Sequence, residues 1–368
     1  MDIRANLAII PDPRIERCKK HLLVDILLLC IIGMACGVES IEDITFFGAA
    51  HLTWLKQYLL LPHGIPSADT ILRVLGRIDH TKFEACLLTW TQGYFRERAH
   101  PGSVIAIDGK TVRGSATETE RGIHLVSAWA DELGLVLGQV KTAEKSNEIT
   151  AIPQLLAALD VAGCIITIDA MGCQKQIAAD IIQGKGDYVL ALKENHPETY
   201  AEASSLFDEP DLGEPEYTEI TKDHGRIEKR EAWLYRDIAW FEGRENWPGL
   251  KAFGCIRSSR TVKEATATEY RYFLTSLTDT AQFARSVRAH WGIENKLHWT
   301  LDVVFREDYA RNRKDHSAAN LSILRKITLN LLRLEATEKL GKQKLSLGRK
   351  RLYASYNPDF LLNILFNL

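Results

Sequence analysis

The order of the elements predicted between residues 104 and 206 constrains the fold most strongly. An apolar, β-branched run at 104–107 is followed by strand-like segments at 122–130 and 133–140, with a short turn between the last two. Helical and strand patterns then alternate over residues 148–158, 164–168, 174–182, 187–192 and 197–206. Three meandering strands followed by crossover units predict an α/β fold, a mixed sheet with helices on both faces.

Two strands of this predicted sheet end at an aspartate. Asp108 follows the run 104–107, and Asp169 follows the run 164–168. In the predicted order these strands are parallel neighbours, and ligands of open α/β sheets bind beyond the carboxyl ends of the strands. One such aspartate is usually a turn former or a helix cap. A pair at equivalent strand ends instead predicts two carboxylates that are close enough to share a divalent cation.

A third acidic candidate lies on a helix predicted from about residue 280 to residue 299 and interrupted by one glycine. Glu294 is four residues from both His290 and His298, so the three side chains are expected on one face. Oxygen ligands favour hard cations such as Mg²⁺, and a pair of these ions supports phosphodiester chemistry. A zinc site made by His290, Glu294 and His298 is the weaker alternative, because no HExxH spacing is present and the cysteines do not cluster.

The overall charge carries no sign of a nucleic-acid partner. The chain has 46 Lys and Arg against 48 Asp and Glu, a formal net charge of −2. Any DNA contact must therefore come from local basic patches. Residues 311–351 hold 12 Lys or Arg and 3 Asp or Glu, which fits either a contact with the DNA backbone or a solvated helical face.

The pattern divides the chain near residue 96. Residues 1–95 read as a helical N-terminal domain, which either binds DNA or serves as a structural or dimerising appendage. Residues 96–368 are predicted to form the catalytic domain, with a β-rich insertion at about 208–277. Strand-like segments of this insertion lie at 216–221, 228–234, 252–258 and 270–276, and a last helix is predicted at 317–335.

The most apolar segment, residues 22–38, raises the question of a membrane span. It is shorter than the roughly 20 residues that a spanning helix needs, and it contains Asp25. A buried helix is therefore expected, with no membrane association. The seven scattered cysteines, without a CxxC pair or a secretory signal, indicate a reduced, cytoplasmic protein.

The chain resembles the H-repeat-associated transposase family of bacterial insertion sequences, which are DDE transposases with an RNase H-like catalytic core. The motifs that carry the resemblance are residues 105–114, 144–149, 167–174, 187–193, 224–228, 290–299 and 301–303. They extend over nearly the whole chain, and the predicted element order is that of the RNase H-like fold. The resemblance implies that Asp108, Asp169 and Glu294 form a catalytic, metal-binding triad that uses Mg²⁺, with Mn²⁺ as a substitute.

The resemblance also implies a biological role. It indicates cut-and-paste transposition, in which the protein binds the terminal inverted repeats of its element and a target DNA. A homo-oligomer, expected to be a dimer on DNA, would act in the cytoplasm at the nucleoid. Two alternatives stay open: an inactive or repurposed transposase that only binds DNA, and a non-transposing nuclease on the same fold.

One departure from the family pattern concerns phosphate binding. Related transposases often place Tyr, Arg and Lys at fixed distances around the helix glutamate, where this chain has Val287, His290 and Leu301. Basic residues expected to contact DNA are therefore Lys110, Arg113, Arg226, Arg288, Lys296, Arg311 and Arg313. Trp291 and Trp299 are candidates for stacking on an extruded base, with core packing as the alternative.

Overall fold

The fold is built on a nine-stranded mixed sheet with the strand order β3-β2-β1-β4-β5-β9-β8-β7-β6. The computed structural model describes residues 2–142, 148–208, 212–223, 225–263 and 265–366, so residues 144–147 of one family motif and His224 of another lie outside it. The strands are β1 Val104–Thr111, β2 His124–Ala130, β3 Leu135–Thr142, β4 Ile165–Ile168, β5 Asp187–Leu192, β6 Tyr217–Asp223, β7 Arg226–Tyr235, β8 Ala252–Val262 and β9 Ala265–Thr275.

The centre of the sheet confirms the RNase H-like order expected from the sequence. Strand β1 pairs antiparallel with β2 and parallel with β4, and β4 pairs parallel with β5. Ile107 lies beside Ile168 in this register, so the residues that follow them, Asp108 and Asp169, are neighbours. One detail differs from the expectation: β1 does not end at Asp108 but continues to Thr111, because residues 108–111 keep pairing with β2.

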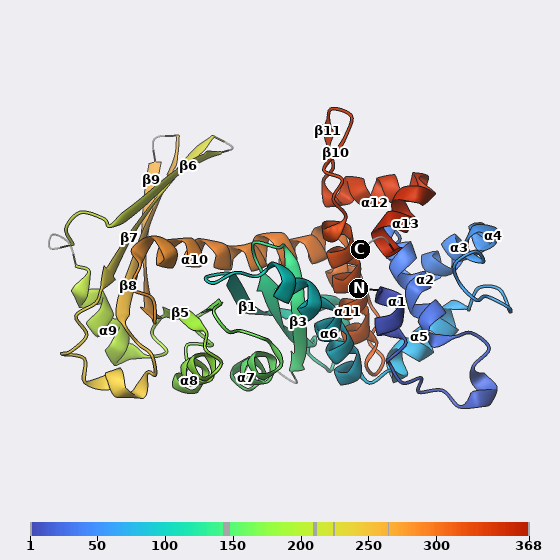
Figure 1. Cartoon of the computed structure of the whole chain (residues 1–368), viewed down its shortest axis with the longest axis horizontal. Coiled ribbons are helices and arrows are strands. Elements are labelled where there is room, and N and C mark those ends of the chain that lie inside the picture. The colour runs from blue at the N-terminus through green and yellow to red at the C-terminus, as the bar shows by residue number, and fades with distance from the viewer. Residues whose placement is uncertain (1, 143–147, 209–211, 224, 264, 367–368) are drawn as a thin grey trace.

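The predicted insertion strands extend the same sheet. Strand β9 pairs antiparallel with β5, and β8, β7 and β6 follow outward (Figure 1). The outer strands are long, at 10 and 11 residues for β7, β8 and β9. Sequence periodicity found these strands but could not show that they join the central sheet.

Helices cover both faces of the sheet, as predicted. Helices α7 (Glu148–Ala158) and α8 (Lys175–Gln183) lie along one side, and α10 (Thr280–Gly292) runs along the other (Figure 1). Helix α9 (Pro197–Leu206) packs against β9 near the outer strands. Helix α10 contacts β1, β4 and β5, and therefore crosses the strands that carry the two aspartates.

The N-terminal segment is helical, as expected. Its helices are α1 Ile3–Leu7, α2 Leu23–Ala35, α3 Ile41–Ala50, α4 Leu52–Leu55, α5 Ala68–Arg77 and α6 His80–Arg98, with a 3-10 helix at Glu16–Cys18. The apolar α2 is buried along almost its whole length, which confirms the prediction of a core helix. Among the described residues, none of the helices has both the length and the apolar character needed to cross a membrane.

The C-terminal helices return to the N-terminal ones. Helices α11 (Ser317–Leu334), α12 (Leu347–Tyr356) and α13 (Pro358–Phe366) all contact α2. The amide of Asn320 on α11 donates to backbone carbonyl groups near the end of α5, and that of Asn330 donates to the Val136 carbonyl on β3. One buried helix thus joins the N-terminal helices to the sheet within a continuous hydrophobic core. An independent role for residues 1–95 stays a prediction.

Candidate active site

Asp108 is held in place by close packing behind its neighbour Gly109. A Cβ on Gly109 would lie 2.4 Å from Nε2 of His124 and 2.5 Å from Oε1 of Glu148, so only glycine fits there. His124 and Glu148 form a buried pair, with the ring also bonded through Nδ1 to the Thr111 hydroxyl at 2.9 Å. The side chain of Asp108 is 13% exposed and lines an open cavity.

Asp169 begins the turn that follows β4. Its Oδ1 accepts hydrogen bonds from the backbone N–H groups of Met171, at 3.1 Å, and Gly172, at 3.3 Å. Asp169 therefore does act as a turn former, which is the usual role of a lone aspartate after a strand. It also lines the same cavity as Asp108, so the structural role and a place in the site coexist.

Glu294 lies where α10 changes its helical geometry. The α-helix ends at Gly292 and continues as π-helical segments over Ile293–His298 and Thr300–Val304. The sequence predicted a regular helix through this stretch, so the π geometry is a difference. Wide π turns inside helices occur often at functional sites. A Cβ on Gly292 would lie 1.9 Å from Oδ1 of Asp131, which explains why the helix has glycine where it passes the β2–β3 turn.

The two histidines of this helix have different partners. Nδ1 of His290 lies 2.9 Å from the Thr167 hydroxyl on β4. Nδ1 of His298 lies 3.4 Å from Oε2 of Glu294 and 3.6 Å from Oδ2 of Asp108. The metal-capable group found among the described residues is therefore Asp108, Glu294 and His298. His290 of the zinc alternative also lines the cavity, but its Nδ1 is bonded to Thr167 and it is not part of this group.

The three predicted carboxylates line one open cavity of about 620 Å³. Its wall combines the acidic groups with the cations Lys193 and Arg271, neither of which stood out in the sequence. Arg271 comes from β9, and its guanidinium lies 5.4 Å from the centre of the Trp291 ring. The pairing of β9 with β5 brings it to the site, and no local pattern signals such a long-range contact.

Burial, hydrogen bonds and neighbouring charges shift the pKa values of the three carboxyl groups. Burial, together with the charges of Glu294 and Asp169, raises the pKa of Asp108. The hydrogen bond from His298 lowers the pKa of Glu294, and a hydrogen bond with the Asp108 carboxyl group adds to this effect. Burial raises the pKa of Asp169, and it lowers that of His290 to about 4, so His290 is neutral at pH 7. Carboxylates this close together repel one another when ionised, and a bound cation would stabilise their ionised forms.

Lys110 does not lie free beside the triad. Its ammonium group is buried and lies 2.7 Å from Asp302, 2.9 Å from Glu307 and 3.5 Å from Asp308. Arg113, in contrast, is largely exposed, with a 3.7 Å contact to Asp308. The side chain of Arg113 is thus accessible for the predicted contact with DNA, whereas that of Lys110 is engaged in ion pairs inside the protein.

The other DNA-contact candidates are spread over the molecule. Arg226 lies at the tip of the β6–β7 hairpin and pairs with Glu228 at 2.8 Å. Arg311 and Arg313 line a groove with Arg73 and Arg77 of α5. The groove has a volume of about 550 Å³ and also contains Lys314, Asp69 and Asp315.

The basic C-terminal stretch is neither uniformly solvated nor uniformly available to DNA. Lys326 is fully enclosed and bonds to Ser127 and Gln139, while Arg325 approaches the buried Glu307 at 3.7 Å. Lys350 and Arg351 are also buried, and they donate to backbone carbonyl groups of neighbouring helices. Much of the local positive charge is thus used internally.

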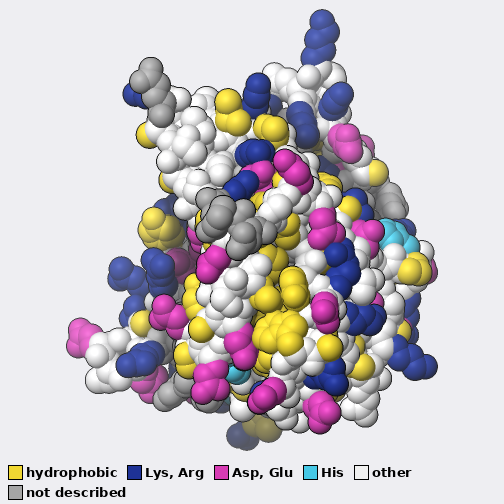
Figure 2. Space-filling model, turned by 90° about the vertical axis from the view of Figure 1, so that its left-hand side faces the viewer, with side chains coloured by type: hydrophobic (Ala, Val, Ile, Leu, Met, Phe, Trp, Pro, Cys, Tyr) yellow, Lys and Arg dark blue, Asp and Glu magenta, His cyan; other side chains and the backbone are white. Residues whose placement is uncertain are grey.

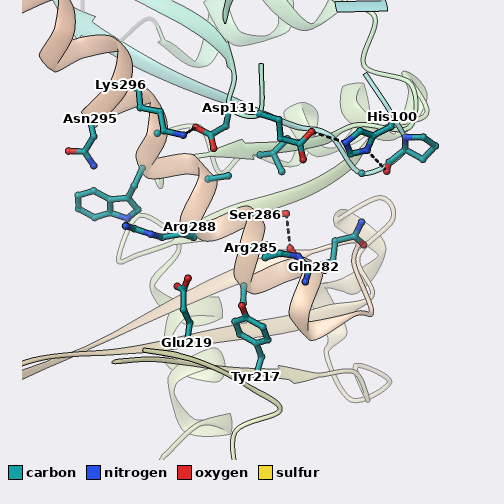
Figure 3. Close-up of a pocket in the computed structure, with 18 residues that line it drawn as sticks. His100, Asp131, Tyr217, Glu219, Gln282, Arg285, Ser286, Arg288, Asn295 and Lys296 are labelled. Carbon is teal, nitrogen blue, oxygen red and sulfur yellow. Dashed lines mark hydrogen bonds and ion pairs between the residues drawn. The ribbon is translucent and has the colours of Figure 1, made fainter. Parts of the chain in front are cut away.

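A second cavity of about 570 Å³ lies beside the first and shares Trp291 and Asn295 with it. In Figure 3 the side chains of Arg285 and Arg288 lie on the same side of the helix as Tyr217 and Glu219 of β6, which line the cavity with them. Lys296 reaches Asp131, with Nζ at 2.7 Å from Oδ1. The predicted DNA contacts Arg288 on α10 and Lys296 on the π-helical segment that follows it therefore line a groove that adjoins the acidic site.

The two candidate stacking residues are exposed. Trp291 is 44% exposed and Trp299 56% exposed, and both border the acidic cavity. The alternative of core packing is therefore wrong for both. The end of the molecule formed by the outer strands carries a central group of hydrophobic side chains among Lys, Arg, Asp and Glu (Figure 2). Positive and negative side chains are mixed on that face. Near α5 and α10, in contrast, several arginines lie together.

A sheet of this order, with acidic side chains at the ends of adjacent strands and on a crossing helix, defines a DDE-type protein with an RNase H-like core. The family model described as Transposase DDE domain matches residues 99–331, and the model described as DDE_Tnp_1-associated matches residues 4–91. The chain belongs to this family of DDE transposases.

Individual relatives agree with the family. The "H repeat-associated putative transposase YhhI" of Escherichia coli (strain K12) is 40% identical over 372 residues, covering 98% of this chain and 96% of that protein. The "Putative transposase YncI" of Escherichia coli O157:H7 is 42% identical over 369 residues, covering 98% and 93%. Among solved structures, a piggyBac transposase synaptic complex with hairpin DNA aligns with a TM-score of 0.43 at 11% identity, covering 99% of this chain and 77% of that one. That similarity is too low to carry an argument.

Proposed function

We propose that this chain is an active DNA transposase that binds the ends of its element and catalyses phosphodiester hydrolysis and strand transfer with Mg²⁺ or Mn²⁺. The observation that carries the proposal is the presence of Asp108, Asp169 and Glu294 around one open cavity. Three separated segments of the chain contribute these carboxylates. Burial raises the pKa values of Asp108 and Asp169, and the charges of Glu294 and Asp169 add to the effect at Asp108. Buried carboxylates in this arrangement lower the stability of the fold unless a cation binds between them.

The donor set fits a hard divalent cation. Asp108 and Glu294 would hold the ion, and Asp169 has one carboxylate oxygen engaged by the turn and a second one for the site. When bound, such ions supply activation of the attacking oxygen and stabilisation of the leaving oxygen. The residues of the chain then orient the phosphodiester and hold the three carboxylates apart at fixed positions.

Positive and aromatic side chains around the cavity suit a DNA strand. Arg271 and Lys193 border the carboxylates and can neutralise nonbridging phosphate oxygens, in place of the Arg and Lys that the family pattern puts near the helix glutamate. The residues at those family positions supply no positive charge, because Leu301 is apolar and fully buried and burial keeps the His290 ring neutral at pH 7. The exposed rings of Trp291 and Trp299 are suited to base stacking.

The decisive experiment uses a labelled DNA that carries the element's own inverted repeats. With Mg²⁺ or Mn²⁺ the full chain should nick the repeat ends and join them to a target. Asp108→Asn, Asp169→Asn and Glu294→Gln should each reduce cleavage by about a hundredfold or more. Glu198→Gln, an exposed acid on α9, is the matched control and should cleave normally. A triad variant that cleaves at the wild-type rate would refute the proposal.

Two outcomes would favour the alternatives. Specific binding to repeat DNA without cleavage under any divalent metal would indicate an inactive or repurposed DNA-binding protein. His290 and Leu301, which stand where the family pattern has Arg and Lys, motivate this test. Cleavage without strand joining would indicate a nuclease. We further propose that the protein acts as a dimer on DNA, in the cytoplasm at the nucleoid, because a pair of element ends must be processed together.

A further inference from the structure

We propose that His298 is a direct nitrogen ligand of the cation that Asp108 and Glu294 hold, and that this ligand gives the site a preference for Mn²⁺ over Mg²⁺. The inference rests on the proposed function and adds to it a residue outside the acidic triad. It concerns which atoms bind the ion and which ion they favour.

The spacing of the three side chains matches one coordination sphere. One ligand atom from each of Asp108, Glu294 and His298 lies within 4.8 Å of the other two. Nδ1 of His298 is 3.4 Å from Oε2 of Glu294 and 3.6 Å from Oδ2 of Asp108. Ligands at about 2.1 Å from a shared ion are separated by about 3 to 4 Å. An ion between these atoms thus requires only small side-chain adjustments.

Among the described residues, the polar partners of the His298 ring are the two carboxylates of the site, Asp108 and Glu294. His298 is 6% exposed, and its Nε2 is a buried nitrogen without a hydrogen-bond partner in the part of the chain that the structure describes. Its Nδ1 faces the two carboxylates only. His290, on the same helix, differs because the Thr167 hydroxyl occupies its Nδ1. The Nδ1 atom of His298 is therefore directed at the position that an ion shared by the two carboxylates would take.

The π-helical segment fixes His298 in this position. Ile293, Leu297 and Leu301 are fully buried and anchor one side of the segment in the core. The adjacent residues Glu294 and His298 are thereby held at the cavity, next to Asp108. The preceding Gly292 lets the helix approach Asp131 at a distance that no other residue permits. The ligand geometry is therefore set by the rigid core and not by a flexible loop.

A mixed nitrogen and oxygen set changes the expected metal. Mg²⁺ strongly prefers oxygen ligands and retains its waters, whereas transition metals accept imidazole readily. Mn²⁺ accepts carboxylate, water and imidazole together. We therefore expect the wild-type protein to bind Mn²⁺ at least about tenfold more tightly than Mg²⁺.

The test is pulsed electron paramagnetic resonance on the full chain with stoichiometric Mn²⁺ and no DNA. A directly bound histidine should produce a ¹⁴N hyperfine coupling in the electron spin-echo modulation. His298→Asn should abolish this coupling and weaken Mn²⁺ binding by about tenfold or more in calorimetry. His290→Asn is the matched control on the same helix and should keep the coupling. His298→Asp should restore binding and shift the preference toward Mg²⁺.

The outcomes separate this inference from the function on which it rests. If Mn²⁺ binds in an Asp108-dependent manner but the wild-type spectrum lacks nitrogen coupling, His298 is not a ligand, and the proposed function stands. If Mn²⁺ binding is unaffected by Asp108→Asn, both proposals fail. The wild-type spectrum alone decides the ligand question, so the test does not depend on the folding of the His298 variants.

Discussion

The ammonium group of Lys110 lies 2.9 Å from the fully buried carboxylate of Glu307. Lys110 itself is only two residues along the chain from Asp108. Asp302, Asp308 and Glu307 surround this cation, and the carboxylates keep the pKa of Lys110 above its usual value although burial acts to lower it. Lys110 and Arg325 in turn lower the pKa of Glu307 to about 2, against the effect of its burial.

This cluster makes Lys110 a stability residue. Lys110→Met should destabilise the fold by about 3 kcal/mol or more, since it leaves buried carboxylates without their main cation. The measurement is urea unfolding, with Arg113→Ala as the exposed control, which should change stability little. A Lys110→Met protein of wild-type stability with reduced DNA affinity alone would show that the residue contacts DNA instead.

Gly292 should be irreplaceable for the geometry of the active site. Alanine normally favours helix by about 1 kcal/mol over glycine, but here its Cβ would meet the Asp131 carboxylate at 1.9 Å and Trp129 Nε1 at 3.2 Å. Gly292→Ala should therefore lower both the unfolding free energy, by about 1–3 kcal/mol, and the rate of DNA cleavage. Gly348→Ala, on α12 with no atom within 4 Å of the added Cβ, is the control and should be neutral or stabilising. Equal behaviour of the two variants would contradict the close approach.

Glu84 should make stability depend on pH. Burial raises its pKa to about 7, and its Oε1 accepts the Lys141 N–H at 3.1 Å. Because the folded pKa exceeds the unfolded value, the contribution to stability is complete below about pH 4.5 and is lost as pH rises through about 7. Between pH 4.5 and 8, wild type should lose up to about 3 kcal/mol relative to Glu84→Gln in urea unfolding. Parallel pH profiles of the two proteins would show that Glu84 does not titrate in this way.

The groove between α5 and residues 311–315 should bind the DNA backbone. Its side chains Arg73, Arg77 and Arg311 are exposed and lie together. The double change Arg73→Ala with Arg77→Ala should weaken binding to all sequences alike, and reduce the slope of log affinity against log salt by about 0.9 for each phosphate that the protein no longer neutralises. Fluorescence anisotropy over a salt series measures this. Arg244→Ala with Lys251→Ala removes two exposed cations elsewhere and should leave the slope unchanged.

Local patterns were sufficient to predict the elements that form the core of the sheet. The β-branched runs before Asp108 and Asp169 predicted β1 and β4, and the structure pairs them in parallel. Apolar periodicity predicted α2 and α10 as well. These signals are local in origin, because the spacing of apolar residues depends on which face of a single element is buried.

Sequence by itself determined the order of the elements and the acidic residues that belong near the ends of adjacent strands. Only the tertiary structure decided which other side chains share their cavity: Arg271 arrives through the pairing of β9 with β5, and His298 through a π-helical segment. It also decided that Lys110 belongs to an internal charge cluster while Trp291 stays exposed. Such contacts join residues far apart in the chain, and they depend on strand register, helix geometry and the packing of the whole core, which no short stretch of sequence encodes.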